Sequence, residues 1–509
     1  MLVKRNRNIV VLLCDQLRSD FLSVYGCKAF ATPNIDKISK MGTVFDNAIT
    51  QSTVCAPARA CMMTGRLVSD HGVWTNDIPF REGLEYLPQR MNSLGYNTGA
   101  FGRLHHYPAK DSKGFTIVHQ MEEGRLGEHE EYLQWLRGKH PEVKRIWNIT
   151  NGAFNYPEED YYEYWITSKV IDFINDNECS IDKKPFLAWV SFQGPHTPLD
   201  PPKEVKGSVD PTLLPKLITA DEKQLAPVVR YRQAYGGTLG ISEEEILESR
   251  KLYAETIVEI DRQVGRLLDH LASLGILENT TFIFSADHGD LLGDFHLQQK
   301  GPFPYHNQLS IPLIISNHPG VRCGVHSSSL AGNIDIPATV LDIAGSERGI
   351  GISRSLINLS AENPENPREV IFSEFCDSIK TVFDGRYKFS YYPFTGVSEL
   401  YDIQEDPNEI LDLTGQQKYG VIESQMLRHI IDFCIISKGV RIEAHDFVPE
   451  QQAGLYKKFP DHLDEFPAAH PLSNIKQLDS LRREGLSADY NEFCKSKKII
   501  AHYGLYWDQ

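Results

Sequence analysis

The sequence predicts an α/β fold, in which a large, mostly parallel sheet is sandwiched by helices and followed by a smaller antiparallel-sheet subdomain. Three observations support this prediction. Short, continuous apolar runs recur through residues 8–316, and such runs are typical of strands that are buried on both faces. Segments with helical periodicity separate these runs, which favours parallel strands joined by helical crossovers. Beyond residue 366 the pattern changes to short strands joined by turns.

The chain has 509 residues, which is enough for two or more domains, and we expect the α/β domain to span residues 1–365. The helix predicted at residues 251–274 shows the clearest pattern in this domain, with apolar residues at every third or fourth position. The predicted strands of this domain are residues 8–13, 96–101, 185–192, 281–285 and 311–316. The predicted helices are residues 32–41, a segment that begins at residue 55, and residues 85–95, 166–175, 251–274 and 335–345.

Two long segments of this domain have little periodicity. Residues 107–165 are rich in Tyr, Trp, Glu and Gly, and we expect an insertion over the top of the sheet, where loops usually set substrate selectivity. Residues 199–245 are rich in Pro and Gly and are predicted to be mostly loop.

The C-terminal part is predicted to contain two segments. Residues 366–415 form the antiparallel-sheet subdomain, and residues 416–509 form an extension that is helical and irregular. The extension includes a helix at residues 420–437 and an acidic, aromatic tail that we expect to cover the sheet or a neighbouring subunit. The short strands of the subdomain are predicted at residues 370–373, 381–383, 387–391 and 399–402.

Composition excludes several classes of protein. A formal net charge of −16 argues against a nonspecific nucleic-acid binder. No apolar run is long enough to span a membrane. The apolar stretch at residues 8–13 is too short for a signal peptide and lacks a cleavage site, so we expect a cytoplasmic protein. The nine cysteines are scattered and form no Cys-x-x-Cys pair, which indicates neither a disulfide framework nor a zinc ribbon.

The most informative motif is Cys55-Ala-Pro57-Ala-Arg59, with Gly-Arg six residues later. Proline suits the first turn of a helix, so Cys55 is expected at the helix N-terminus and Arg59 one turn further on. Free N–H groups and a partial positive charge at that end favour an anion, and a guanidinium adds donors for a tetrahedral oxyanion. A Cys55 thiolate would itself be a plausible nucleophile, while the alternative is an ordinary helix start.

Polar side chains follow several predicted strands. In a parallel sheet, ligands bind outside the carboxyl ends of the strands, so these residues are expected to meet at one edge. Carboxylate, amide and imidazole groups favour Ca²⁺, Mg²⁺ or Mn²⁺. The candidate metal ligands are Asp15, Gln16, Asp287 and His288, and the other strand-end residues are Arg103, His105 and His196.

Over residues 8–415 the chain resembles the type I, formylglycine-dependent sulfatases of the alkaline phosphatase-like superfamily, which includes the related phosphonate monoester hydrolases. The resemblance implies that a formylglycine-generating enzyme oxidises Cys55, and that the hydrated aldehyde is the nucleophile and a metal ligand. Arg59 would hold this geminal diol. Asp15, Gln16, Asp287 and His288 match the family's metal-ligand pairs, for one divalent ion that is most often Ca²⁺, with Mn²⁺ or Mg²⁺ as alternatives.

The resemblance also implies roles around the ester. Lys300 matches a lysine that contacts the ester, and His196 matches a histidine that protonates the leaving group. Arg103 would neutralise the ester oxygens, and His105 would take a proton from the remaining hydroxyl. Asn76 matches a polar substrate-binding position.

Two positions depart from the family pattern. Gln16 stands where many sulfatases have Asp, and with His288 it is similar to phosphonate monoester hydrolases and to some carbohydrate or choline sulfatases. Arg103 stands where the family has lysine; an arginine can still bind an oxyanion in bidentate fashion, but it is a poorer proton donor.

We therefore expect an arylsulfatase-like hydrolase that converts a sulfate ester to alcohol and sulfate. The substrate would be a small anionic ester, such as a sulfated sugar or an aryl or alkyl sulfate. A phosphonate monoester or phosphodiester hydrolase is the alternative enzyme, and a non-catalytic binding protein of the same fold is the alternative class. We expect neither nucleic acid nor a membrane as a partner, and a homo-oligomer stays open.

Overall fold

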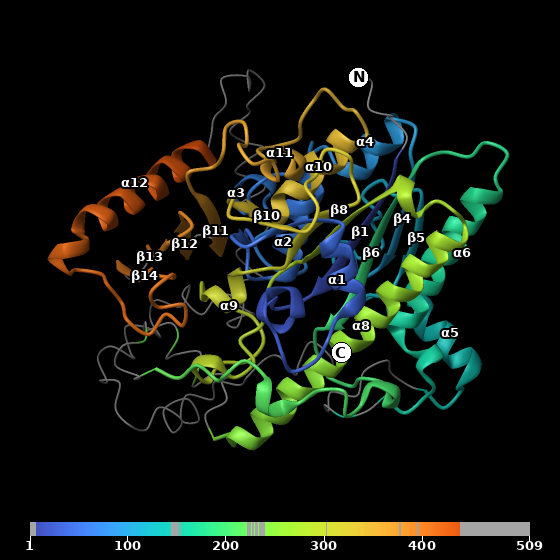
Figure 1. Ribbon diagram of the computed structural model, residues 1–509, viewed down its shortest axis with the longest axis horizontal. Coiled ribbons are helices and arrows are strands. Elements are labelled where there is room, and N and C mark those ends of the chain that lie inside the picture. Colours follow the sequence, from blue (N-terminus) through green and yellow to red (C-terminus); the bar gives the residue numbers. More distant parts are fainter. Residues whose placement is uncertain are drawn as a thin grey trace. The chain divides into compact units, whose positions relative to one another are not determined.

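The computed structural model describes residues 7–437, apart from 144–151, 153, 302, 376–377, 394–395 and all of 221–239 except 225, 229 and 233 (Figure 1). The acidic tail predicted beyond residue 437 lies outside the described residues. Two compact units are formed. The first combines residues 7–216, 242–290 and 307–371, and the second combines residues from 217–241, 291–306 and 372–437. The domain boundaries expected at residues 365 and 415 stay predictions.

An eight-stranded sheet forms the centre of the first unit, with strand order β5-β4-β6-β1-β7-β8-β2-β9. β1 lies between β6 and β7 and runs parallel to both. β8 is antiparallel to its two neighbours, so the sheet is mostly but not wholly parallel. The strands are β1 (Asn8–Asp15), β2 (Gly42–Phe45), β4 (Asn97–Gly102), β5 (Ile117–Gln120), β6 (Phe186–Pro195), β7 (Thr280–Ala286), β8 (Leu313–Ser316) and β9 (Val325–Ser327). The short strands β3 (Ala48–Ile49) and β10 (Ala331–Gly332) pair separately.

The central strand β1 is buried along its whole length. Its apolar residues from Ile9 to Leu13 are 0% exposed, because neighbouring strands cover both edges and helices cover both faces. Burying one such aliphatic side chain contributes about 1.5–3 kcal/mol relative to leaving it exposed. The continuous apolar pattern of the sequence therefore corresponds to a strand with no solvent-facing side.

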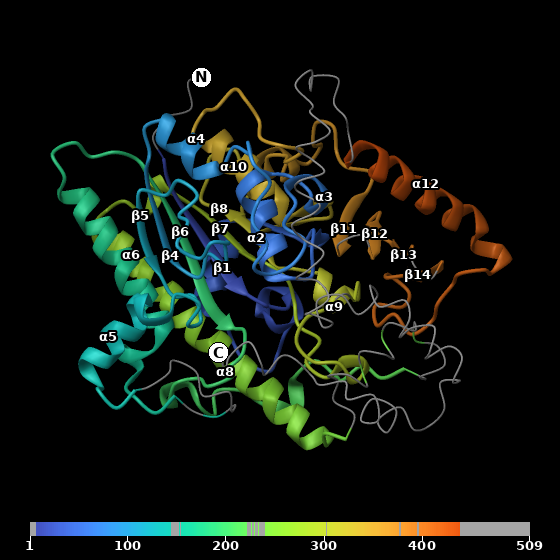
Figure 2. The same cartoon turned by 180° about the vertical axis from the view of Figure 1, so that it is seen from behind.

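Helices lie on both faces of this sheet (Figures 1 and 2). One layer contains α1 (Pro33–Lys40), α6 (Tyr162–Cys179) and α8 (Glu243–Ser273), in which α8 contacts both α1 and α6 and the three helices contact strands β2, β4, β6 and β8. The other layer contains α2 (Cys55–Thr64), α4 (Leu87–Ser93) and α10 (Ile336–Ile343), with the short helices α3 (Val68–His71) and α11 (Leu356–Leu359) beside them. The expected sandwich of helices around a sheet is confirmed.

One local expectation was wrong. Helix α8 begins at Glu243 rather than near residue 251, because Ser242 and Glu245 form a capping box that extends the helix into the segment predicted as loop. The segment 107–165 also contains regular structure, namely β5 and α5 (Glu131–Lys139). α5 buries only Tyr132, Leu133 and Leu136, and β5 is a half-buried edge strand, so neither shows a strong apolar pattern.

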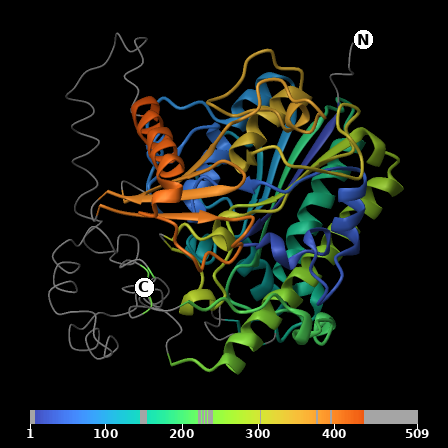
Figure 3. The ribbon, with the colours of Figure 1, turned by 60° about the vertical axis from the view of Figure 1, so that its left-hand side comes forward.

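The second unit contains the small sheet predicted from the sequence, with strand order β11-β12-β13-β14 (Figure 3). Its later strands pair antiparallel, as expected. Helix α12 (Gly420–Ser437) packs against β12 and β13. The strands are β11 (Ile371–Phe375), β12 (Ile379–Phe383), β13 (Tyr387–Tyr392) and β14 (Val397–Asp402). Within the described residues, we find no helix that combines the length and apolar character needed to cross a bilayer.

Candidate active site

The carboxyl ends of four parallel strands bring the predicted residues of the first unit together. In the sheet register, Cys14 of β1 pairs with Ala286 of β7, and Gly102 of β4 pairs with Ser191 of β6. The residues that follow these positions therefore leave the sheet at the same edge. They are Asp15, Gln16, Arg103, His105, His196, Asp287 and His288.

Cys55 is the first residue of α2, as the proline in its motif predicted. The side chain of Asn76 caps this helix, because its Oδ1 accepts a hydrogen bond from the N–H of Ala56 at 3.2 Å. Gly65 ends the helix with φ 62°, and a Cβ there would lie 2.6 Å from the carbonyl oxygen of Ile350. The motif thus sets both ends of one buried helix, and Asn76 lies beside the predicted nucleophile.

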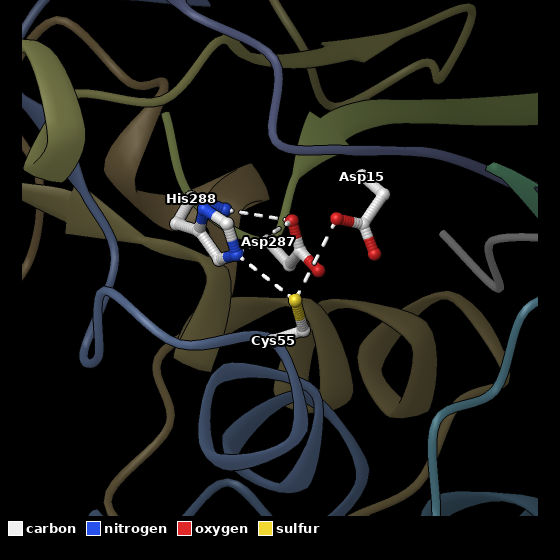
Figure 4. A group of neighbouring side chains, drawn as sticks. All are labelled: Asp15, Cys55, Asp287 and His288. Carbon is white, nitrogen blue, oxygen red and sulfur yellow. Dashed lines mark hydrogen bonds and ion pairs between the residues drawn. The ribbon is translucent and has the colours of Figure 1, made fainter. Parts of the chain in front are cut away.

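Four side chains converge at this helix start (Figure 4). Ligand atoms of Asp15, Cys55, Asp287 and His288 all lie within 4.8 Å of one another, and each residue is 0% exposed. The Cys55 Sγ is 3.1 Å from His288 Nε2 and 3.6 Å from Asp15 Oδ1. Two carboxylates, an imidazole and one further ligand form a donor set that suits a divalent cation.

His288 is held in the orientation of a metal ligand. Its Nδ1 lies 2.8 Å from the carbonyl oxygen of Gly289, which assigns the ring proton to Nδ1. Nε2 is therefore the nitrogen with a lone pair, and it faces Cys55. Such an outer hydrogen bond orients a ligating histidine and raises its basicity.

Gln16 lies next to this group but is tied to a carboxylate that the sequence reasoning did not select. Its backbone has φ 68°, and its N–H donates to Asp287 Oδ1 at 2.9 Å. Its side-chain nitrogen donates to Asp290. An amide binds a cation through its oxygen, so the contact with Asp290 is compatible with the predicted role of Gln16.

Arg59 connects the two carboxylates. Its Nη2 is 2.9 Å from Asp15 Oδ2, its Nε is 2.8 Å from Asp287 Oδ2, and its Nη1 donates to Ser191 Oγ at 2.7 Å. Burial lowers the pKa of Arg59, but the two carboxylates outweigh this effect and raise it. Arg59 therefore places one positive charge between two buried carboxylates. Its expected contact with a geminal diol stays a prediction.

Arg103 lies between the Cys55 side and the His196 side of this edge. Its Nη1 pairs with Asp15 Oδ2 at 3.1 Å and also with Glu123. Its Nη2 is 2.8 Å from His105 Nδ1 and 4.0 Å from Cys55 Sγ. Burial lowers the pKa of Arg103, and the nearby carboxylates of Asp15 and Glu123 raise it overall. The Arg103 guanidinium thus faces the predicted nucleophile.

His105 accepts from this guanidinium, so its ring proton is assigned to Nε2. Its backbone N–H donates to the buried carboxylate of Glu122. In this arrangement His105 is placed as a hydrogen-bond donor, and accepting a proton requires Arg103 to release Nδ1. The predicted role of His105 as a base stays a prediction.

His196 is 7% exposed, and its Nδ1 lies 2.6 Å from the carbonyl oxygen of Thr197 and 3.1 Å from Glu123 Oε1. Glu163 holds the preceding backbone by accepting from the N–H groups of Gln193 and Gly194. Burial raises the pKa of Glu163 to about 8. The loop that carries His196 is therefore anchored from inside the protein.

Lys300 belongs to the second unit, where it is 3% exposed. Its expected contact with the ester stays a prediction.

Sequence reasoning missed Ser191, Gln193, Asp290 and Glu123 as neighbours of the site. Asp290 is two residues after His288 and could have been chosen, whereas Glu123 lies in the insertion and carries no local signal.

Two family models together, and several known proteins, match most of this chain. The family model described as "Sulfatase" matches residues 7–346, and the model "N-sulphoglucosamine sulphohydrolase, C-terminal" matches residues 293–434. The chain is 28% identical over 450 residues to an arylsulfatase of Clostridium perfringens, covering 81% of this chain and 91% of the relative. It is 23% identical over 496 residues to an N-acetylglucosamine-6-O-sulfatase of Bacteroides thetaiotaomicron, covering 83% and 85%.

Among solved structures, the phosphonate monoester hydrolase of Agrobacterium radiobacter superposes with a TM-score of 0.73 at 22% identity, covering 84% of this chain and 95% of that one. At this identity the likeness concerns the fold alone. The family match extends over more than half of the chain and includes every strand-end residue described above. The chain therefore belongs to the sulfatase family of sulfuric ester hydrolases.

Proposed function

We propose that this protein hydrolyses a sulfate ester to an alcohol and sulfate, with formylglycine derived from Cys55 as the nucleophile and one divalent metal ion. The observation that carries the proposal is the position of Cys55 at the start of α2, with its Sγ among the ligand atoms of Asp15, Asp287 and His288. Conversion of Cys55 would require a formylglycine-generating enzyme in the host cell.

Asp15, Gln16, Asp287 and His288 would hold the metal, and Ca²⁺ fits the oxygen-rich donor set best. A divalent cation at this position supplies Lewis-acid polarisation of a sulfuryl oxygen and lowers the pKa of an adjacent hydroxyl. Arg59 lies between the two carboxylates and places a positive charge beside them, and a metal would require both to be ionised.

The chain's own residues divide the remaining work. Arg103 Nη2 faces the Cys55 position and would neutralise charge on the transferred group, together with Lys300. His196 would donate a proton from Nε2 to the leaving oxygen, because its Nδ1 is bonded inside the protein. Asn76 caps α2 and would orient both the helix start and the substrate.

The organic part of the substrate is proposed only as a class. One relative is named an N-acetylglucosamine-6-O-sulfatase and another an arylsulfatase, so a sulfated sugar or an aryl sulfate is the first class to test. The pair of Gln16 and His288 favours one alternative on the same site, a phosphonate monoester or phosphodiester hydrolase. The tetrahedral sulfur of a sulfate ester and the tetrahedral phosphorus of a phosphonate or phosphodiester fit the same donors. Measured turnover must therefore decide between the two activities.

The test uses protein in which peptide mass shows the loss of about 18 Da expected when formylglycine replaces cysteine. We would measure kcat/KM for 4-nitrophenyl sulfate, a nitrophenyl phosphonate monoester and bis(4-nitrophenyl) phosphate. The sulfate should be the best substrate, and Cys55→Ala should lower all rates by about 10⁴-fold or more. Preferred turnover of the phosphonate or the diester would select the alternative, and full activity of Cys55→Ala would refute the nucleophile.

A further inference from the structure

We propose that Glu123 is a positioning residue that keeps His196 protonated for donation to the leaving group and orients Arg103 toward the nucleophile. This inference rests on the proposed function. Glu123 is 4% exposed and has a backbone φ of 57°, a conformation that is costly for a residue other than glycine. It follows β5, and the pairing of Gly102 with Gln120 brings it beside the residues after β4.

One oxygen of this carboxylate has three polar neighbours from different parts of the chain. Glu123 Oε1 accepts from Arg103 Nη1 and from Gln193 Nε2, and it lies 3.1 Å from His196 Nδ1. Arg103 and Gln193 are nine-tenths or more buried, so the contacts are shielded from water. A buried carboxylate with this set of neighbours joins the Cys55 side of the site to the His196 side.

The contacts assign the chemistry of each imidazole nitrogen. His196 Nδ1 has two close acceptors, the carbonyl oxygen of Thr197 at 2.6 Å and Glu123 Oε1 at 3.1 Å, whereas the amide nitrogen of Gln193 is more distant at 3.3 Å. Nδ1 therefore carries a hydrogen in both protonation states, and Nε2 is the nitrogen that gains and loses a proton. A neighbouring carboxylate favours the imidazolium, which is the form that a general acid needs before the leaving group departs.

The other groups around His196 do not replace this charge. Arg103 is cationic and opposes protonation, but it is paired with Asp15 as well as with Glu123. Glu163, on α6, contacts the backbone of Gln193 and Gly194 rather than the imidazole, and burial raises its pKa to about 8. The nearest groups of α8 at Gly194 are the neutral side chains of Thr256 and Ile260. Among the described residues, Glu123 is therefore the carboxylate that pairs with the His196 imidazole.

The test is Glu123→Gln, which keeps the size of the side chain and removes its charge. The rate of a general acid falls as pH rises through its pKa, so loss of the carboxylate should move the alkaline limb of the kcat/KM profile to lower pH by about one unit. Hydrolysis of an alkyl sulfate should fall by about 10²-fold, whereas a nitrophenyl sulfate, whose leaving group needs little protonation, should change by about threefold or less.

A matched control is Glu131→Gln. Glu131 Oε2 lies 2.9 Å from His119 Nδ1, so it forms the same kind of pair, but both side chains are partly exposed at 34% and 44%. This variant should leave the rates and the pH profile unchanged. A double-mutant cycle with His196→Ala completes the design, because Glu123→Gln should add little to the alkyl sulfate defect once the imidazole is gone.

The outcomes separate the two proposals. An equal loss across leaving groups in His196→Ala would remove His196 as the acid and with it this inference. In the other case, His196→Ala lowers the rate more for alkyl sulfates than for nitrophenyl sulfates while Glu123→Gln leaves the alkaline limb of the kcat/KM profile in place. That pair of results would overturn only the role of Glu123. If Glu123→Gln does not fold, Glu123→Asp is measured instead, and effects that are additive with His196→Ala would also overturn that role.

Discussion

Two pairs of buried carboxylates in the first unit have different electrostatic partners. We call Asp15 and Asp287 the strand-end pair, and Glu130 and Glu163 the neutral pair; all four are 0% exposed. Arg59 forms ion pairs with both members of the strand-end pair. Within the described residues, Glu130 and Glu163 instead accept from backbone N–H groups and form no ion pair. Burial raises the pKa of each to about 8.

The difference shows that burial alone does not mark a functional acid. Removing a carboxylate from water favours its protonated form, and a few N–H donors do not fully offset that cost. A buried guanidinium does offset it, because the opposite charge acts at close range in a medium of low dielectric. Only the strand-end pair is therefore prepared for a divalent metal, which requires ionised ligands.

The largest expected effect is on the strand-end pair. Asp287→Asn removes a ligand charge, so the protein should lose its bound metal and at least about 10³-fold in kcat/KM. Metal content by mass spectrometry and turnover of an aryl sulfate measure both. Glu163→Gln is the control from the neutral pair and should keep the metal. Full activity after exhaustive chelation would refute a metal-dependent reaction.

A smaller loss of activity is expected when Arg59, the cation that pairs with Asp15 and Asp287, is replaced by a cation of different shape. Arg59→Lys leaves one ammonium where three guanidinium nitrogens contact Asp15, Asp287 and Ser191, so kcat/KM should fall by about 10²–10³-fold. Arg66→Lys is the matched control, since Arg66 pairs with Asp70 at the partly exposed end of the same motif. Activity of Arg59→Lys within threefold of the parent would show that charge alone suffices.

The smallest expected effect is on the pH dependence of folding stability, to which Glu163 of the neutral pair contributes. A carboxyl group with a raised folded pKa holds a proton that the unfolded chain releases, so stability falls as pH rises from about 4.5 to about 8 and is then constant. Glu163→Gln removes the contribution of Glu163 to this pH-dependent loss of stability, which is on the order of a few kcal/mol. The difference in Tm between pH 6 and pH 9 should therefore be smaller in Glu163→Gln than in the parent. An equal or larger difference would contradict a neutral Glu163.

Local sequence patterns determined several features of this protein. The unbroken apolar runs specified β1 and β7, because a strand covered on both faces has no polar position. Pro57 and Gly65 specified the two ends of α2, because each restricts or permits particular backbone angles. The polar residues after each strand indicated the site, because parallel strands end at a common edge.

The tertiary structure alone decided the rest. The reversed direction of β8 leaves no trace in its composition, since an apolar run reads the same either way. Arg59 reaches Asp15 and Asp287 across 44 and 228 positions of sequence, and Glu123 reaches His196 from an insertion without periodicity. Such contacts depend on strand order and register, which arise from packing of the whole sheet rather than from any single segment.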